Sequence, residues 1–431
     1  MTPVELLQQL IRFDTTNPPG NEAECIGFVR RLLEDAGCEV ELYAREPARP
    51  NLISRLRGQG DRAPILLQGH VDVVTTAGQD WTRPPFGGEL VDGYVWGRGA
   101  LDMKGGVAMM VSAFLRAARE ETALPGDVIL CVLADEENGG DYGAKFLVEE
   151  HAHLFEGVRW SLGEFGGFSL DLGGKRLYPI QVAEKQICWL KARVPGKAGH
   201  GAMIQRGGTM SRLGTFLRDL DRKRTPVHVT PVARAQIEEM AAAVGRPQRD
   251  LLLALLKPRL TDRLLPLLRE RARSTEALLR NTVNATIVHA GEKVNVVPAF
   301  VDVELDARAL PGFGPDDVIA EVQQLVGDDI ELELVRYDEG PPEPRLDQFD
   351  ALAAIIRELE PGAVPVPLLQ GGVTDARFFA QLGIQNYGFL PLKLPGDFRF
   401  ASLIHAPDER VPAEAIEFGA EAVFRALQRL G

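Results

Sequence analysis

The stretch LLQGHVD, residues 66–72, joins an apolar run and a glycine to a histidine and an aspartate two positions apart. Such an apolar run predicts a buried strand of an α/β sheet. Ligands bind beyond the carboxyl ends of such strands, and side chains two apart on an extended chain point to the same side. We therefore predict that His70 ligates a metal and that Asp72 orients it, with a purely structural strand end as the alternative.

Strand-like and helix-like segments alternate on both sides of this stretch. Residues 2–5, Thr-Pro-Val-Glu, have the form of a capping box with proline in the first turn, so we expect the chain to open with a helix. Apolar strands that alternate with helices indicate an α/β sheet with both faces covered. Strands are expected at 39–43, 51–56, 65–68 and 128–134, and further helices are expected up to Gly37 and at 106–119 and 414–430.

The pattern changes near residue 184, where alternating strands and glycine-rich turns begin. Strand, helix, two strands, helix and strand is the order of a ferredoxin-like α+β unit. The strands are expected at 186–194, 283–288, 300–307 and 330–337, with a helix at 316–326. We predict an inserted domain at 184–340 with a helical elaboration at about 234–280. The main domain is then discontinuous, at 1–183 and 341–431, and the turn-rich segment 340–344 returns the chain to it.

The overall composition excludes several classes of protein. The 431 residues are 45% hydrophobic and 25% charged, with 48 basic and 61 acidic side chains and a net charge of −13. Nucleic-acid binders normally carry a basic face, so no nucleic acid is expected as a partner. No apolar run approaches the roughly 20 residues that cross a bilayer, and the first residues do not resemble a secretory signal. The four cysteines lack CxxC spacing, so we expect buried thiols in a cytoplasmic protein without membrane association.

Four further segments offer carboxylates or a histidine. A glycine-rich loop at 97–106 contains Asp102, which also suits a helix N-cap, and the third glycine of a dinucleotide fingerprint is missing there. An apolar strand ends in three adjacent acids at 135–137, which would repel one another without a cation or hydrogen-bond donors. Glu164 follows a short apolar run, and His405 lies in a turn-forming segment near the end of the sequence. Nitrogen and oxygen ligands without sulfur suit a catalytic zinc, and one shared carboxylate would make a two-metal site.

Motifs in a fixed order resemble those of one enzyme family. The chain is similar over essentially its whole length to co-catalytic zinc hydrolases that include aminoacylase, carboxypeptidase G, carboxypeptidase S and succinyl-diaminopimelate desuccinylase. The resemblance implies a zinc-peptidase-like catalytic domain, with a mixed, mostly parallel sheet flanked by helices, and an inserted ferredoxin-like lid or dimerisation domain. The motifs are GHVDVV at 69–74, GRGALDMKGG at 97–106, DEENGG at 135–140 and GHG at 199–201.

The resemblance also implies a metal-ligating role for five residues. His70 and Glu164 would hold one metal ion, Glu137 and His405 would hold the other, and Asp102 would bridge the two. Two Zn²⁺ ions per chain are expected, with Co²⁺ or Mn²⁺ as alternatives.

The remaining implied roles are catalytic and substrate-binding. Asp72 would steady His70, and Glu136 would be the general base that takes a proton from water and passes it to the leaving nitrogen. His200 would act in the partner subunit's active site and polarise the scissile carbonyl. Arg308 could instead form an ion pair with Asp306 or Asp302. Residues 371–377 resemble the family's glycine-rich active-site loop, in which Asp375 and Arg377 could equally form a structural pair. The substrate-binding residues would be Asn295, Arg308, Gly372 and Thr374.

The resemblance and the residues that carry it imply a metal-dependent hydrolase that cleaves the amide bond of N-acyl amino acids or of small peptides with a free carboxylate. A dipeptidase or carboxypeptidase-type exopeptidase is one alternative, and a non-catalytic metal-binding member of the family is another. The helical segment and residues 94–104 resemble the carboxypeptidase S and N-fatty-acyl amino acid hydrolase branch, which implies a long or apolar acyl group. The resemblance further implies a homodimer through the inserted domain.

Overall fold

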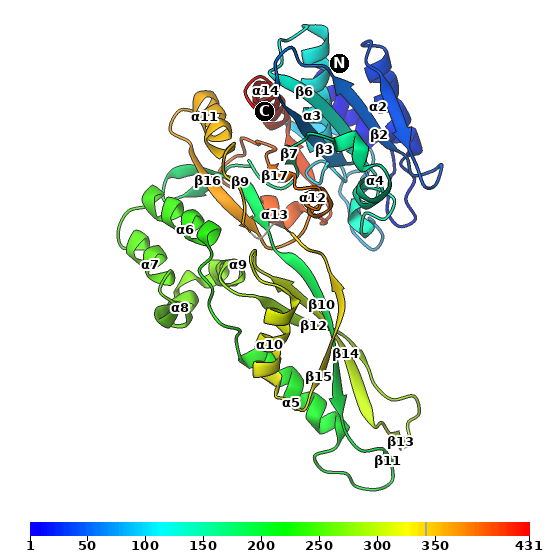
Figure 1. Ribbon diagram of the computed structural model, residues 1–431, viewed down its shortest axis with the longest axis vertical. Coiled ribbons are helices and arrows are strands. Elements are labelled where there is room, and N and C mark those ends of the chain that lie inside the picture. The colour runs from blue at the N-terminus through cyan, green and yellow to red at the C-terminus, as the bar shows by residue number, and fades with distance from the viewer. Residues whose placement is uncertain (341–342) are drawn as a thin grey trace.

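The computed structural model describes residues 1–340 and 343–431 and is built on a large mixed sheet (Figure 1). Within these residues its strands follow the order β1-β2-β6-β3-β7-β17-β9-β16, with β8 paired to β9. The central strands β6, β3, β7 and β17 are parallel, whereas β1, β2 and the contact of β17 with β9 are antiparallel. The expected mixed, mostly parallel α/β sheet is confirmed. The strands are β1 (Val40–Tyr43), β2 (Asn51–Leu56), β3 (Arg62–His70), β6 (Gly126–Leu133), β7 (Trp160–Gly163), β8 (Leu170–Leu172), β9 (Lys175–Glu184), β16 (Val364–Gln370) and β17 (Gln385–Gly388).

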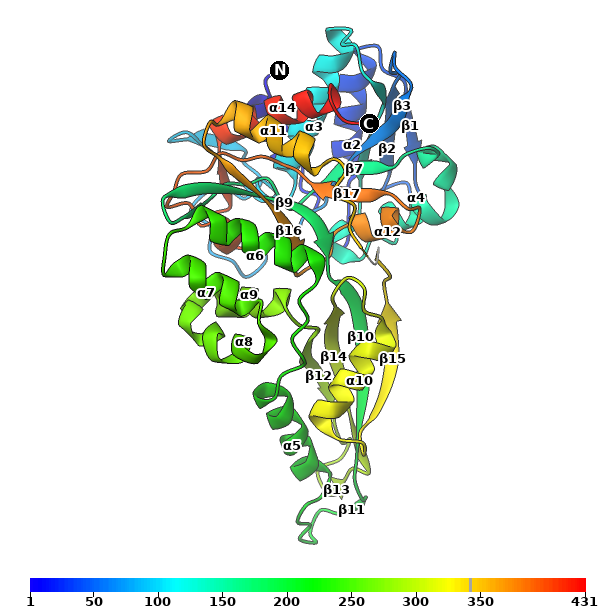
Figure 2. The ribbon, with the colours of Figure 1, turned by 60° about the vertical axis from the view of Figure 1, so that its left-hand side comes forward.

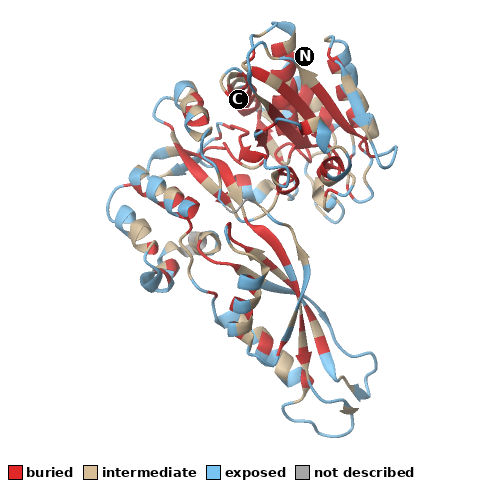
Figure 3. Ribbon diagram, in the orientation of Figure 1, coloured by how far each residue is buried: buried red, intermediate tan, exposed pale blue. Residues whose placement is uncertain are grey.

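Helices cover both faces of this main sheet. In β3, Ile65 and Leu67 belong to one hydrophobic core and Leu66 belongs to another. Because successive side chains of a strand point to opposite faces, a continuous apolar run needs cover on both sides, and Figure 3 shows the central strands buried. One face packs on α1 (Pro3–Ile11), α2 (Ala23–Glu34), α3 (Lys104–Arg119), α11 (Phe349–Leu359) and α14 (Ala413–Leu427), and the other on α4 (Ala144–Glu150) and α12 (Ala376–Ala380).

A second sheet, here called the four-stranded unit, extends away from the main sheet (Figure 1). Its antiparallel strands lie in the order β12-β14-β10-β15, and one face packs on α5 and α10. Along the chain the order β10, α5, β12, β14, α10, β15 is the ferredoxin-like order expected from the sequence. The domain boundaries stay predictions, and residues 341–342 of the turn-rich segment lie outside the described residues. The elements are β10 (Gln186–Pro195), α5 (Thr209–Arg222), β12 (Thr282–His289), β14 (Phe300–Ala309), α10 (Pro315–Val326) and β15 (Glu331–Tyr337).

The predicted helical segment at 234–280 packs against the edge of the main sheet, although the sequence assigned it to the inserted domain (Figure 2). The side-chain oxygen of Gln236 in α6 accepts the backbone N–H of Leu369 in β16 at 3.0 Å. Both views place α6 beside β16 and β9, with α7 and α8 farther from the main sheet. The helices are α6 (Pro231–Ala243), α7 (Gln248–Leu255), α8 (Pro258–Leu264), η3 (Leu265–Arg271) and α9 (Ala272–Leu278).

Short elements complete the fold. Strands β4, β5 and β18 form a small sheet, and β11 pairs with β13 near the tip of the four-stranded unit. No helix in the part of the chain that the structure describes is long and apolar enough to span a membrane. The remaining elements are β4 (Glu89–Val91), β5 (Tyr94–Trp96), η1 (Glu136–Asn138), η2 (Ala152–Phe155), β11 (Gly199–His200), β13 (Val296–Val297), α13 (Phe400–Leu403) and β18 (Arg410–Pro412).

Candidate metal centre

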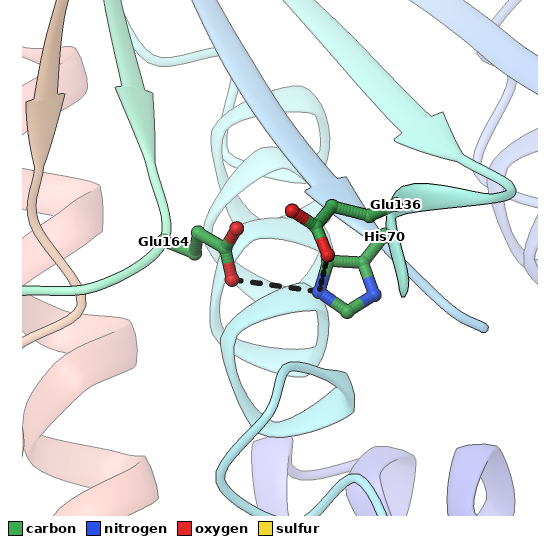
Figure 4. Close-up of side chains that lie close together, drawn as sticks. All are labelled: His70, Glu136 and Glu164. Carbon is green, nitrogen blue, oxygen red and sulfur yellow. Dashed lines mark ion pairs between the residues drawn. The ribbon is translucent and has the colours of Figure 1, made fainter. Parts of the chain in front are cut away.

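The ends of three neighbouring parallel strands bring the first candidate ligands together. β3 ends at His70, the acids at 135–137 follow β6, and Glu164 follows β7, while β3 lies between β6 and β7 in the sheet. Because parallel strands end at the same edge of a sheet, these side chains meet there. Figure 4 shows the carboxylates of Glu136 and Glu164 directed toward the ring of His70.

Asp102 connects two histidines that lie far apart in the sequence. Nε2 of His70 lies 3.4 Å from Oδ1 of Asp102 and 3.4 Å from Oε2 of Glu164. Nε2 of His405 lies 3.1 Å from Oδ2 of Asp102 and 3.3 Å from Oε1 of Glu137. The five candidate ligands therefore form two groups that share Asp102.

The spacing of these atoms and their missing hydrogen bonds fit metal coordination. Two ligand atoms that lie about 2.0–2.1 Å from one tetrahedral zinc ion are roughly 3.3–3.4 Å apart, close to the 3.1–3.4 Å measured between the histidine and carboxylate atoms. Among the described residues, Nε2 of His70 and Oε1 of Glu137 are buried without a hydrogen-bond partner. Two sets of potential ligand atoms, His70 with Glu136 and Glu164 and His70 with Asp102 and Glu137, each lie within 4.8 Å of one another.

The electrostatics of the centre indicate a shortage of positive charge. Burial, reinforced by Glu164, holds the pKa of Glu136 well above its ordinary value. Burial also raises the pKa of Glu137 and of Glu164. The carboxylates of Asp102 and Glu137 raise the pKa of His405 to about 10. Raised pKa values of the carboxyl groups and of the histidine both indicate that negative charge is in excess at this site. Two bound divalent cations would balance that charge.

A fully buried aspartate supports both the first histidine and the loop that carries two glutamates. The backbone oxygen of Asp72 lies 3.0 Å from Nδ1 of His70, and its Oδ1 lies 3.5 Å from the same nitrogen. The carboxylate accepts the backbone N–H of Glu136 and of Glu137 at 3.1 Å, and the side-chain amide of Asn17 at 2.8 Å. Although burial opposes the shift, His70 and Asn17 lower the pKa of Asp72. The geometry suits a residue that positions ligands.

A buried ion pair behind the bridging residue was not predicted from the sequence. Oε2 of Glu409 accepts from Nη1 of Arg98 at 2.6 Å, and Oε1 accepts the backbone N–H of Leu101 at 2.7 Å and of Asp102 at 3.2 Å. Both charged side chains are at most 1% exposed. The only signal in the sequence is that Arg98 precedes Asp102, and Glu409 follows His405, by four positions.

A second buried group, also not predicted, connects the N-terminal segment to the acidic loop. Nη2 of Arg49 lies 2.7 Å from Oε1 of Glu22 and 2.9 Å from Oδ1 of Asp135. The side-chain amide of Asn17 donates to the same oxygen of Asp135 at 2.9 Å. Asp135 adopts a left-handed backbone conformation with φ of 69°, which is uncommon for a residue other than glycine. These contacts hold the turn that presents the two following glutamates.

The surroundings of Glu136 include an arginine from helix α12. Nη1 of Arg377 lies 4.0 Å from Oε1 of Glu136, and its Nε lies 3.5 Å from Oδ2 of Asp338. Neither carboxylate oxygen of the buried Asp375 has a hydrogen-bond partner within the described residues. Asp375 and Arg377 are therefore not hydrogen-bonded to each other, and Arg377 also lies close to the predicted general base; their role as a structural pair stays a prediction.

Two predicted residues lie far from this centre within one chain. His200 is exposed in β11, and its Nδ1 accepts the backbone N–H of Ala202 at 3.1 Å. Asn295 is exposed directly before β13. Figure 1 places β11 and β13 at the end of the four-stranded unit that is farther from the main sheet. The structure does not bring these two residues to the ligands of the same chain.

The other predicted substrate-binding residues lie nearer the junction of the two sheets. Arg308 makes a two-bond ion pair with Asp306, at 2.6 and 3.1 Å, which is the alternative that its sequence context suggested. Thr374 donates its hydroxyl to Oε2 of Glu184 at 2.9 Å. Gly372 lies on the rim of a cavity beside β16.

With this geometry established, the chain can be compared with known proteins. A model of peptidase family M20/M25/M40 matches residues 66–429, which contain all five candidate ligands. The chain belongs to this family. The resemblance that the motifs indicated is confirmed, and so are the predictions of a metal-dependent hydrolase and of a metal cofactor at the level of the family and of the ligand groups.

Three relatives represent different named activities within the family. The protein named "Probable carboxypeptidase S-like 2" of Dictyostelium discoideum is 28% identical over 81% of this chain and 68% of its own length. The N-fatty-acyl-amino acid synthase/hydrolase of Homo sapiens is 27% identical over 85% of this chain and 74% of its own length. A succinyl-diaminopimelate desuccinylase of Cereibacter sphaeroides is 28% identical over 96% of this chain and 95% of its own length.

Solved structures share the fold over nearly the whole chain. An M20 family metallo-carboxypeptidase from Sulfolobus solfataricus superposes with a TM-score of 0.69 and 16% identity, covering 99% of this chain and 98% of its own. Human carnosine dipeptidase 1 gives a TM-score of 0.67 and 16% identity, with coverages of 99% and 96%. A Bacillus subtilis dinuclear metal binding peptidase gives 0.63 and 15%, with coverages of 99% and 96%. At these identities the likeness establishes the fold alone.

Proposed function

We propose that the chain hydrolyses the amide bond of N-acyl amino acids, or of small peptides with a free carboxylate, with two bound zinc ions and Glu136 as general base. The observation that carries the proposal is the arrangement of His70 and His405 on the two carboxylate oxygens of Asp102, with Glu136 at 4.0 Å from His70. Cobalt or manganese are the alternatives to zinc, because the ligands are nitrogen and oxygen atoms only.

Each ligand has a defined task in this proposal. Zinc ions bound here would polarise the scissile carbonyl and lower the pKa of water to about 7. His70 and Glu164 would hold one ion, Glu137 and His405 the other, and Asp102 both. Strand ends position His70, Glu137 and Glu164, and the ion pair of Arg98 with Glu409 supports the backbone of Asp102.

Glu136 moves the proton in the proposed reaction. Its carboxylate takes a proton from the attacking water and returns it to the nitrogen of the leaving amine. Burial raises the pKa of Glu136, which brings its proton affinity closer to that needed at neutral pH. The charge of His70 opposes this rise in the pKa of Glu136.

The substrate-binding roles and the partner subunit belong to the same proposal. Arg308 would release Asp306 and bind the substrate carboxylate through its planar guanidinium group, with Asn295, Gly372 and Thr374 as further contacts. His200 would reach the active site of the second subunit of a homodimer, which accounts for its exposed position at the end of the four-stranded unit.

The proposed environment is a reducing cytoplasm. Cys25, Cys38, Cys131 and Cys188 are all buried free thiols, which is usual for a protein of that compartment. Neither nucleic acid nor a membrane is part of the proposal.

Glu136→Gln tests the reaction, with Glu156→Gln on the surface as the matched control. We expect the first variant to retain about two metal ions per chain by elemental analysis and to lose roughly 10²–10⁴-fold in kcat, while the control behaves as wild type. Unchanged turnover in Glu136→Gln would exclude it as the base. A panel of N-acyl amino acids and dipeptides, with and without chelator, tests the substrate class, and a strict requirement for a free α-amino group would favour the exopeptidase alternative.

A further inference from the structure

A cavity of about 630 Å³ lies between the edge of the main sheet and the helices α6, α7 and α9. Its size falls within the roughly 300–1,000 Å³ that is usual for small-molecule sites. The sheet side includes Leu177 and Leu369, and the helix side includes Met240, Leu252 and Leu278. Figures 1 and 2 both show α6 lying beside β16 and β9 at this edge of the sheet.

The helices leave apolar side chains partly uncovered where they face this cavity. Their own small core takes up Ile237, Leu255 and other buried residues. Met240 and Leu252 are only partly buried although both line the cavity. Partly exposed apolar surface in a concave site gains free energy when an apolar group covers it.

The cavity adjoins the metal centre through the segments that carry its ligands. Five residues after Glu164 the chain lines the cavity at Ser169, and Phe398 lines it seven residues before His405. A smaller hollow of about 30 Å³ is lined by Asp102 and Glu164 together with apolar residues of the same segments. Its wall includes the stacked rings of Phe168 and Phe400, whose centroids are 4.1 Å apart, and Phe168 directly precedes Ser169 of the larger cavity.

The charge of the lining decides which half of the substrate enters. Among the described residues that line the cavity, Asp171 is the charged one and no arginine or lysine is present. An amino-acid carboxylate or a succinyl carboxylate would enter without a cation and close to a like charge, which is costly. A neutral hydrocarbon chain meets no such cost. The acyl half of the substrate therefore fits the cavity, whereas the carboxylate half does not.

We infer that this cavity, formed by the helical segment α6–α9, is the binding site for a neutral aliphatic acyl chain of the substrate. The inference rests on the proposed function, because it places one end of the same scissile amide. It assigns a specificity role to Met240, Leu252 and Leu278, and it excludes N-succinyl compounds as preferred substrates.

A chain-length series tests the inference in the wild-type holoenzyme. N-acylglycines from acetyl to dodecanoyl should show kcat/KM rising about fourfold for each added methylene until the cavity is filled, which corresponds to about 0.8 kcal/mol per methylene. N-butanoylglycine should exceed N-succinylglycine by roughly tenfold or more, because only the latter brings a charge into the site. A flat series, or a preference for the succinyl compound, overturns the inference.

Two variants locate the site, and one matched variant controls for the substitution. Met240→Trp and Leu252→Trp fill the cavity and should abolish the rise of kcat/KM with acyl-chain length. Leu260→Trp places the same bulk on the exposed surface of α8, outside the cavity, and should leave the series unchanged. If kcat/KM depends on acyl-chain length in the same way in all three variants, the assignment of the cavity is overturned.

Binding of N-dodecanoylglycine to the chelator-treated protein, measured by calorimetry, separates this inference from the proposed function. Binding that weakens in Met240→Trp and Leu252→Trp supports the cavity as an acyl-chain site even if no hydrolysis is found. Hydrolysis without any effect of chain length on binding or rate supports the proposed function and overturns the cavity assignment. Neither binding nor hydrolysis overturns both.

Discussion

Asp72→Asn should weaken metal binding without removing a metal ligand. The carboxylate of Asp72 accepts three hydrogen bonds in a fully buried position, from Asn17 and from the backbone of Glu136 and Glu137. Asparagine has nearly the same shape, but its amide nitrogen cannot accept. Whichever way the amide is turned, at least one buried N–H donor loses its partner.

The hydrogen bonds lost in Asp72→Asn set the expected loss of stability and of zinc affinity. A buried donor that loses a charged acceptor costs about 1.5–3 kcal/mol in the free energy of unfolding. The loop that carries Glu137 and the ring of His70 then lose part of their fixed orientation. Loss of such supporting contacts typically costs 10- to 100-fold in metal affinity, so we expect the Kd for zinc to rise by that factor.

The assay is competition for zinc with a chromophoric chelator, together with urea denaturation of the metal-free protein. Asp127→Asn is the matched control, because Asp127 accepts from Arg55, Arg57 and the backbone N–H of Gly58 at a site away from the metal centre. The control should lose stability and keep its zinc affinity. A folded Asp72→Asn protein whose Kd for zinc stays within twofold of wild type would refute the positioning role.

Two further predictions concern buried charges. Burial lowers the pKa of Lys185 to about 7, so the unfolded chain binds a proton that the folded chain lacks between about pH 7 and 10, and wild-type stability should rise across that window. The free energy of unfolding of Lys185→Met minus that of wild type should accordingly fall by about 4 kcal/mol from pH 7 to pH 10 in urea titrations, and a constant difference would contradict the burial. Glu409→Gln leaves the charge of Arg98 buried and unpaired, and should lower the free energy of unfolding by about 3–5 kcal/mol. Glu34→Gln, which breaks an exposed pair, should cost at most about 1 kcal/mol in the same assay, and equal losses would contradict the argument.

The sequence predicted the centre of this fold because the relevant signals are local. The apolar run before His70 and the apolar strand before residues 135–137 both end in polar residues, and parallel strands bring such ends to one edge. The capping box at the first helix is also local, and both of its hydrogen bonds are present. Convergence of His405 with Asp102 was implied by family resemblance alone, since no spacing rule relates residues so far apart.

Other features depended on contacts that no local pattern encodes. The ion pair of Arg98 with Glu409 joins segments near opposite ends of the chain, and each residue alone resembles an ordinary surface charge. Arg377 was considered as a partner of Asp375, yet its nearest acids are Asp338 and Glu136. Side-chain partners of this kind are selected by packing of whole elements and by the need to pair every buried charge.

The sequence by itself determined which chemical groups are available and which strand ends present them, because strand periodicity, turn residues and motif order act over a few positions. The tertiary structure decided how those groups are supported and what lies beside them. It packed the helical segment of α6–α9 against the main sheet and left a mainly apolar, open cavity between them. The physical reason is that hydrophobic packing is non-directional, so an amphipathic helix specifies that it must be covered but not by which surface.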